Sequence, residues 1–338
     1  MGADVLFICH TQYQAMVSVV KVLCAPEGFR ADFWLSAALP ARAQLAARLQ
    51  EAGLAGRTFL PQDNTEQYPS LENTSLLMRR TMAFKHAAAA GFPLRLGEYR
   101  EICIYNDWNS AGRYLQDRGV AYVLGEDTYN NLDHPNHWID DQAAEPDFAR
   151  RQLTGAGYLF WGAYRGVTAV EVARPETVAY YPGKLREFDV FARLKTLDAA
   201  GRAALRRVFA GEEIPPVNPD SCLFLSRGYY ADREVFCQAD QDRLCRYIVE
   251  KYAAGRQLFI KTHPRDETDY KALFPDAVVL NRFMPAELLD YCFDVRFGRA
   301  IGFGTNAVRN LRCADELIDI QDINLADFRT PPPEQEKG

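Results

Sequence analysis

Two short segments carry side chains suited to acid–base chemistry. Glu126 and Asp127 follow an apolar run in GEDTY, and His263 follows another in KTHPRDE, where Pro264 stiffens the backbone just after it. A carboxylate at a strand end can take the proton of an attacking hydroxyl, and a histidine can donate to a departing phosphate or protonate it. The plainer alternatives are a solvated acidic pair and a histidine that caps a sheet.

Groups that could hold a phosphate stand near this histidine. Lys261 and Arg265 are cations two residues before and two residues after it. Further on, FGRAIGFGTNAVRN predicts a strand, a glycine-rich turn and a helix, in which Gly304, Thr305 and Asn306 would offer a close backbone, a hydroxyl and free amides. The turn lacks the lysine of a P-loop, so the motif alone is weak evidence for phosphate binding. Its support comes from lying in the same domain as His263 and Lys261.

Two helix starts could add contacts to a sugar or a nucleotide. Thr11 can cap the helix after the first strand, and with Gln12 it stands where free amides face an anion or a sugar hydroxyl. A plain capped helix explains the same residues equally well. Glu287 falls in the first turn of a helix opened by Pro285, where it either complements the helix dipole or binds a ribose.

The elements that position these residues alternate between short apolar runs and longer helical patterns, which is typical of an open, mostly parallel α/β sheet. The first half predicts strands at 5–9, 31–35, 58–60, 101–105 and 121–124, and helices at 12–23, 41–52, 71–89 and 110–118. Residues 147–210 are less regular and predict one strand at 177–181. The second half predicts strands at 222–225, 257–262, 277–280, 295–297 and 316–320, and helices at 233–254, 268–273, 285–291 and 305–313.

This alternation predicts two Rossmann-like, doubly wound domains that face each other across a ligand cleft. We expect an N-terminal domain over 1–185, a linker region over 186–219, a C-terminal domain over 220–330 and a disordered tail over 331–338. Ligands of open α/β sheets bind beyond the carboxyl ends of the strands, where the candidate residues stand.

Composition narrows the class of protein. The chain has 338 residues and a net charge of -6, which argues against a nucleic-acid binder. Its eight cysteines form no CxxC pair and several lie in apolar runs, as buried thiols of a reducing compartment do. No apolar stretch is long enough for a membrane helix, so we expect a cytoplasmic protein. Contact with the inner face of the inner membrane and a homodimer stay open.

Several motifs point away from metal and cofactor chemistry. His134 and His137 form an HxxH in a proline-containing loop, and Asp240 and Asp242 form a DxD inside a predicted helix. Neither is placed as a metal site requires, so we expect no metal.

The sequence contains no GxSxG, no HExxH and no GxGxxG after the first strand. The commonest classes of hydrolase, protease and dinucleotide-binding protein are therefore excluded.

In their order along the chain, these motifs resemble those of the bacterial sialyltransferases of glycosyltransferase family 52, relatives of the bacterial polysialyltransferases. Glu126-Asp127-Thr128 resembles the acidic D/E-D/E-G motif, His263-Pro264 the HP motif, and Gly304-Thr305 the Ser/Thr motif that follows it. ICHTQYQ and MPAELL are also similar to segments of that family. The chain departs from the family pattern where Thr128 replaces glycine and where Gly304-Thr305 replaces a pair of hydroxyl residues.

The resemblance implies a GT-B fold and a metal-independent, inverting transfer of sialic acid from CMP-sialic acid to a hydroxyl of a surface glycan such as lipooligosaccharide or capsule. In such a fold the N-terminal domain would lie on the acceptor side and the C-terminal domain would bind the nucleotide sugar. No cofactor is implied beyond the donor substrate. Asp127 would be the base, with Glu126 as its substitute, and His263 would stabilise or protonate the departing CMP. Donor contacts would come from Thr11, Gln12, Lys261, Pro264, Arg265, Glu287, Gly304, Thr305 and Asn306.

Other functions fit the same residues. A transferase of this fold could use CMP-Kdo or a UDP-hexose, because the HP motif recognises phosphate more clearly than sugar. A nucleotide-sugar epimerase and a non-catalytic sugar-binding relative are further alternatives. The acceptor pocket is expected from loops 62–76 and 130–142, which carry little readable pattern.

Overall fold

A computed structural model describes residues 3–61, 95–155, 157–181, 183–211, 213–305 and 307–330. The chain divides into two compact units, Met1–Ala204 and Leu205–Gly338. The boundary falls inside the segment 186–219 that we expected to link two domains. Much of that segment is helical, with α7 (Val190–Thr196), α8 (Ala199–Leu205) and a π-helical turn over Arg206–Ala210.

The N-terminal unit is built on a parallel sheet whose strand order is β3-β2-β1-β4-β5-β6-β7. Every neighbouring pair in this sheet is parallel. The central strands are buried along their whole length, as expected where helices cover both faces of a parallel sheet. The strands are β1 (Val5–Cys9), β2 (Ala31–Leu35), β3 (Thr58–Phe59), β4 (Glu101–Ile104), β5 (Tyr122–Gly125), β6 (Val167–Val172) and β7 (Leu185–Glu187).

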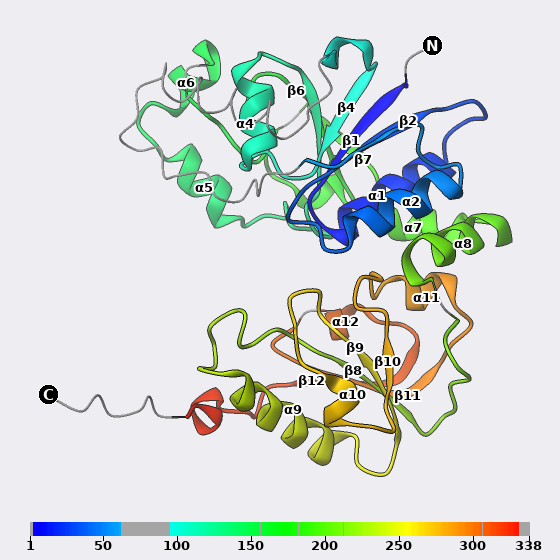
Figure 1. Cartoon of the computed structure of the whole chain (residues 1–338). Coiled ribbons are helices and arrows are strands. Elements are labelled where there is room, and N and C mark those ends of the chain that lie inside the picture. Colours follow the sequence, from blue (N-terminus) through cyan, green and yellow to red (C-terminus); the bar gives the residue numbers. More distant parts are fainter. Residues whose placement is uncertain are drawn as a thin grey trace, which may run out of the picture. The chain divides into compact units, whose positions relative to one another are not determined.

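Helices cover both faces of this sheet because the strand order reverses direction between β1 and β4. Right-handed crossovers place α1 (Gln12–Leu23) and α2 (Arg42–Glu51) on one face and α4 (Ser110–Asp117) on the other, as Figure 1 shows. Helix α7 packs against α1. Two short helices, α5 (His137–Ala143) and α6 (Phe148–Thr154), follow the loop that leaves β5.

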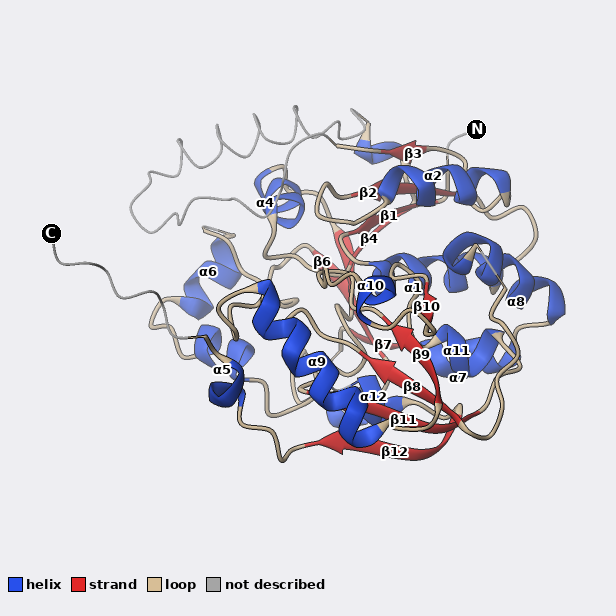
Figure 2. Ribbon diagram, turned by 60° about the horizontal axis from the view of Figure 1, so that its bottom comes forward, coloured by secondary structure: helices blue, strands red, loops and turns tan. Residues whose placement is uncertain are grey.

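The C-terminal unit repeats this plan with a parallel sheet of order β10-β9-β8-β11-β12. Its order reverses between β8 and β11, which corresponds to the reversal between β1 and β4. Figure 2 shows its strands side by side. The strands are β8 (Ser221–Leu225), β9 (Gln257–Lys261), β10 (Val278–Leu280), β11 (Phe297–Phe303) and β12 (Ala314–Ile320), and the helices are α9 (Gln238–Tyr252), α10 (Tyr270–Leu273), α11 (Leu288–Cys292) and α12 (Ala307–Asn310).

Two parallel, doubly wound sheets confirm the predicted α/β fold class, but part of the first half was assigned wrongly. The predicted strand at 177–181 is not a strand: Pro175–Thr177 form a 3₁₀ turn, and Tyr181 has a φ of 56°. The sixth strand is instead β6, which lies ten residues earlier. Val178 is nevertheless buried, because the loop that carries it packs onto the core. Its apolar side chain therefore does not indicate a strand.

Several bounds in the second half also differ from the prediction. The strand expected at 295–297 begins only at Phe297 and continues to Phe303. All four helices predicted for this half are shorter than expected, and each begins two to five residues later than the sequence predicted. The predicted helix 71–89, the acceptor loop 62–76 and the tail 331–338 lie outside the described residues.

Candidate functional site

The predicted residues of the C-terminal unit lie at one edge of its sheet. Leu225 in β8 pairs with Lys261 in β9 and with Gly302 in β11, so the three strands end nearly level. The loops that follow carry the sequences SRG, THP and GT, and they are therefore neighbours. This edge includes the point where the strand order reverses, which is where open α/β sheets bind ligands.

Arg227 joins the loops after β8 and β11 and was not predicted as a site residue. Its Nη1 donates to the carbonyl of Gly304 at 2.8 Å, its Nε donates to Asp232 at 3.3 Å, and its Nη2 donates to Glu234. Gly304 has a φ of 60°, and a Cβ there would lie 2.9 Å from the guanidinium. The absence of a side chain at Gly304 therefore lets Arg227 reach across the reversal point. The sequence signal that could have identified Arg227 is its position two residues after the end of β8.

His263 is held by its backbone and by one ring nitrogen. Its N–H donates to Ser226 Oγ at 3.1 Å, and its Nδ1 accepts the N–H of Arg265 at 3.2 Å. Burial, together with the positive charges of Arg265 and Lys261, lowers the pKa of His263 below its ordinary value. Because Nδ1 is an acceptor, the neutral ring carries its proton on Nε2, which can donate to an anion.

A buried carboxylate fixes the loop that carries this histidine. Asp266 accepts hydrogen bonds from Ser226 Oγ at 2.5 Å, Gln241 Nε2 at 2.6 Å and Tyr270 Oη at 2.8 Å. Because Ser226 Oγ donates to Asp266 and accepts the N–H of His263, it links the buried carboxylate to the backbone of His263. Pro264 is partly buried in the same turn.

The two predicted cations lie in different surroundings. Lys261 is only 6% exposed, and its Nζ donates to the carbonyls of Thr262 at 2.8 Å and Arg282 at 3.1 Å. Burial lowers the pKa of Lys261 to about 8, although Glu287 opposes that shift. Arg265 is exposed and pairs with Asp232 at 3.0 Å. Lys261 therefore binds two backbone carbonyls inside the unit, whereas Arg265 lies at the surface.

The remaining predicted donor contacts are less complete. Thr305 Oγ1 accepts the N–H of Ala307 at 3.3 Å at the start of α12, and Asn306 lies outside the described residues. Burial raises the pKa of Glu287, and nearby Lys261 partly offsets this rise. Glu287 thus lies close enough to Lys261 at the end of β9 for the two charges to interact, and its role as a donor contact stays a prediction.

In the N-terminal unit, Asp127 is placed by a glutamine of α1. Gln14 Oε1 accepts the N–H groups of His10 at 2.6 Å and Thr11 at 3.3 Å, while its Nε2 donates to Asp127 Oδ1. Burial raises the pKa of Asp127, and the bond from Gln14 opposes that rise. A partly buried carboxylate with a raised pKa is a stronger base than an exposed one.

Glu126 faces different neighbours from Asp127. Its Oε2 accepts the N–H of Ala173 at 2.9 Å, and among the described residues its buried Oε1 has no hydrogen-bond partner. Burial raises the pKa of Glu126 to about 7, against the opposing backbone N–H of Ala173. The adjacent carboxylates are therefore not a solvated pair, and each has its own surroundings.

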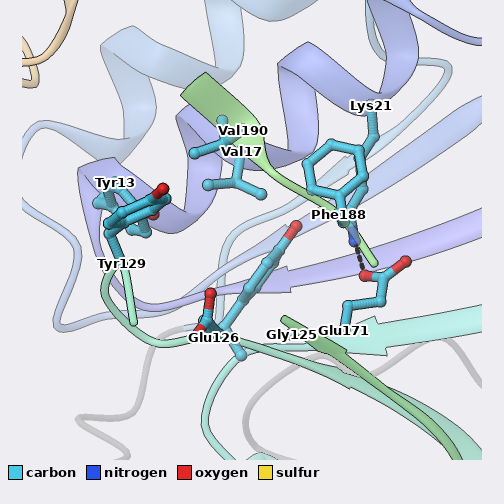
Figure 3. Close-up of a pocket in the computed structure, with 10 residues that line it drawn as sticks. Tyr13, Val17, Lys21, Gly125, Glu126, Tyr129, Glu171, Phe188 and Val190 are labelled. Atoms are coloured by element: carbon cyan, nitrogen blue, oxygen red, sulfur yellow. Dashed lines mark hydrogen bonds and ion pairs between the residues drawn. The ribbon is translucent and has the colours of Figure 1, made fainter. Parts of the chain in front are cut away.

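A pocket borders Glu126 on the α1 side of the sheet (Figure 3). Tyr13 and Val17 of α1 line it together with Tyr129 of the loop after β5 and with Val190, the first residue of α7. The ion pair of Lys21 with Glu171 lies at one end. Its walls thus combine apolar and aromatic side chains with the carboxyl of Glu126 and with this ion pair.

Thr11 and Gln12 both serve the fold. Thr11 Oγ1 accepts the N–H of Gln14 at 3.2 Å, which completes a capping box for α1. Gln12 Nε2 donates to the carbonyl of Pro40 at 2.8 Å. His10 was not predicted, yet its Nε2 meets Asn109 Nδ2 across the β1–β4 reversal point. Burial lowers the pKa of His10 to about 3, so the ring is neutral.

Within the described ranges, no group of three or more His, Cys, Asp or Glu side chains lies close enough to hold a metal ion. The DxD residue Asp240 accepts bonds from Thr330 instead. In the same part of the chain, no helix is long and apolar enough to cross a membrane.

Comparison with known proteins places the fold. No family model matches the sequence. An uncharacterized protein of Haemophilus influenzae is 37% identical over 67 residues, which are 20% of this chain and 21% of that protein. The match thus spans about a fifth of that relative.

Solved structures resemble nearly the whole chain at low sequence identity. An α/β-galactoside α-2,3-sialyltransferase of Photobacterium phosphoreum superposes with a TM-score of 0.51 and 9% identity, covering 97% of this chain and 95% of that one. A UDP-glucosyltransferase of Polygonum tinctorium gives 0.45 and 11%, covering 89% and 76%, and a UDP-GlcNAc 2-epimerase of Methanocaldococcus jannaschii gives 0.40 and 10%, covering 89% and 78%. With the two parallel sheets, the first likeness shows that this chain has the GT-B class of fold.

Proposed function

We propose that this protein is a glycosyltransferase that moves sialic acid from CMP-sialic acid to a hydroxyl of a surface glycan, with inversion and without a metal. The observation that carries the proposal is the level ending of β8, β9 and β11, which gathers His263, Arg227 and the Gly304 turn at one sheet edge. Its support is the GT-B fold and the resemblance of the ordered motifs. The protein would act in the cytoplasm, at the inner face of the inner membrane.

In the proposed reaction, Asp127 takes the proton of the acceptor hydroxyl. The freed oxygen forms a bond to the anomeric carbon as the bond from that carbon to the donor phosphate breaks, and CMP leaves with the electron pair. His263 Nε2–H, Arg227 and the backbone around Gly304 would stabilise the negative charge that develops on the phosphate.

The environment of each group suits this division of roles. His263, with a lowered pKa, is neutral near pH 7 and would act first as a hydrogen-bond donor to the leaving group. Asp127, with a raised pKa, would be an effective base. Lys261 supports this edge from within by tying β9 to the carbonyl of Arg282.

The test is the thermal stabilisation of the purified protein by CMP, UDP, GDP and their sugar conjugates, first without metal and then with magnesium. We expect stabilisation by CMP and CMP-sialic acid that does not depend on magnesium. Stabilisation by CMP-Kdo in preference to CMP-sialic acid would change the donor sugar. A shift with UDP alone, or one that needs magnesium, would refute the sialyltransferase proposal and leave the fold unaffected.

Asp127→Asn provides the second part of the test. This variant should bind the donor as the wild type does and should lose transfer, because the amide cannot accept the proton. Unchanged transfer would assign the base to another acid. Asp232 is less suited to that role, since Arg227 and Arg265 already bind it.

A further inference from the structure

A tight turn over residues 159–162 of the N-terminal unit is held by three side chains from other elements. Gln116 and Gln142 each exchange two hydrogen bonds with the turn, through the backbone of Leu159 and Phe160 respectively, at 2.7–3.1 Å. The next two N–H groups of the turn donate to the carboxylate of Asp107, at 2.7 and 3.1 Å. All three side chains are buried, so four successive N–H groups of this turn are fixed from below.

This support holds Trp161 in an unusual backbone conformation. Its φ is 58°, in the left-handed region that a bulky side chain rarely adopts, and Gly162 follows with a φ of 88°. Strained backbone persists where the surroundings enforce it, and it concentrates at ligand-binding sites. Trp161 stacks on Trp138 of α5 with ring centroids 6.5 Å apart and planes 29° apart, and Trp138 is 59% exposed.

The two indoles lie at the same sheet edge as the candidate base. A Cβ on Gly162 would lie 3.4 Å from Leu124 Cδ2, so the turn packs on the end of β5, which Asp127 closely follows. Asp107 leaves the neighbouring strand β4, and Trp138 stands on the helix that follows the loop from Asp127. Trp138 falls within 130–142, where the sequence predicted part of the acceptor pocket.

We propose that Trp138 and Trp161 form a stacking platform for one pyranose ring of the acceptor glycan, an inference that rests on the proposed function. A pyranose offers an apolar face of C–H groups to an indole and hydroxyls at its rim. The helix that carries Trp138 also carries polar groups: the ring of His137 lies 4.6 Å from that of Trp138, and Asp140 Oδ1 accepts from Tyr180 Oη at 2.8 Å.

The platform is tested on the whole protein by saturation-transfer NMR with methyl β-galactoside and methyl β-glucoside. This measurement needs no donor and no turnover. We expect the strongest transfer to the ring protons of one sugar face in the wild type, and its loss in Trp138→Ala. Phe236→Ala, which removes an exposed aromatic ring of the other unit, should retain the signal. Absence of transfer to both glycosides, or an unchanged signal in Trp138→Ala, would overturn the proposal.

Kinetics separate this inference from the proposed function. In Trp138→Ala we expect the acceptor KM to rise about tenfold, as loss of one good aromatic contact would produce, with the KM for the donor unchanged. Trp161→Phe should show a smaller rise, because a phenyl ring retains part of the stacking surface. Transfer with unaltered acceptor KM in both variants would refute the platform and leave the transferase standing. Glycoside binding in a protein without transferase activity would refute the transferase and keep the platform.

Discussion

Gln14 binds Asp127 with one end of its amide and the start of its own helix with the other. Its Oε1 accepts the N–H groups of His10 and Thr11, so the amide cannot flip without losing both bonds, and Nε2 is thereby aimed at Asp127 Oδ1. The side chain is fully buried. The cap of α1 and the position of the candidate base are therefore one structural arrangement.

Gln14→Met should shift the pH dependence of transfer. The bond from Gln14 favours the charged form of Asp127, so its loss raises the pKa of a base that must be unprotonated to act. The acidic limb of the kcat/KM profile should therefore move to higher pH. The variant should also lose about 1 kcal/mol of stability through the lost cap.

Gln12→Met is the matched control for this effect. Gln12 is a buried glutamine of the same helix whose Nε2 binds a backbone carbonyl rather than Asp127. It should lower stability comparably and leave the acidic limb in place. Equal pH profiles for Gln14→Met and the wild type would show that Gln14 only caps the helix.

Glu126→Gln should flatten the dependence of stability on pH. The pKa of Glu126 is about 7 in the folded protein and near 4.5 when unfolded, so the folded state binds this proton more tightly. Its contribution is fully present below about pH 4.5 and is lost as the pH rises through about 7, by up to about 3 kcal/mol before screening is considered. Chemical denaturation at pH 5 and pH 8 measures this loss. An equal loss in Glu126→Gln would assign the dependence to other groups, such as Asp107.

His263→Ala should reduce transfer by about 100-fold to 10,000-fold, the usual range for a positioned proton donor or acceptor. The fold should stay intact, because the variant loses only the bond from the N–H of Arg265 to the ring and keeps those made by the backbone of residue 263 and by Asp266. Circular dichroism and donor binding report the fold. Activity within a few fold of the wild type would rule out a catalytic role.

Arg227→Ala should weaken donor binding by about tenfold or more, as loss of a charge-assisted hydrogen bond worth about 1.5–3 kcal/mol predicts. Arg299→Ala is the control, because Arg299 also lies in an ion pair, with Glu316, and its strand partner is Cys222 near the start of β8. Isothermal titration calorimetry with CMP compares the two. Equal affinities would remove Arg227 from the donor site.

Pattern reasoning from the sequence located the regular parts of the fold well. Strands such as Val5–Cys9 and Ser221–Leu225 are continuous buried apolar runs, which a covered parallel sheet requires, and their ends marked the candidate residues. The strand at Val167–Val172 was missed because Thr168 and Glu171 interrupt its apolar run. Glu171 is buried only because Lys21 and Arg186 pair with it, and such pairing across distant segments leaves no local pattern.

The candidate site was predicted in part for the same reason. Asp127 and His263 stand directly after strands, so position alone singled them out. Nothing in the sequence distinguishes the roles of Gln12 and Gln14, which stand two residues apart in the same helix. Only the structure shows that Gln12 donates to the carbonyl of Pro40 and Gln14 to Asp127. Arg227 stood at a strand end with no accompanying motif, and its partner Gly304 lies 77 residues away.

The guanidinium of Arg227 already has two carboxylate partners, Asp232 and Glu234. An incoming phosphate must compete with them, and the competition favours the ligand that carries more charge. Under the proposed function, the donor presents a phosphodiester with one negative charge, whereas released CMP presents a monoester that approaches two near pH 7. The protein should then retain its product more tightly than its substrate at this arginine. Released CMP would therefore inhibit the reaction by binding again, and a phosphatase that removes the monoester from solution should relieve that inhibition.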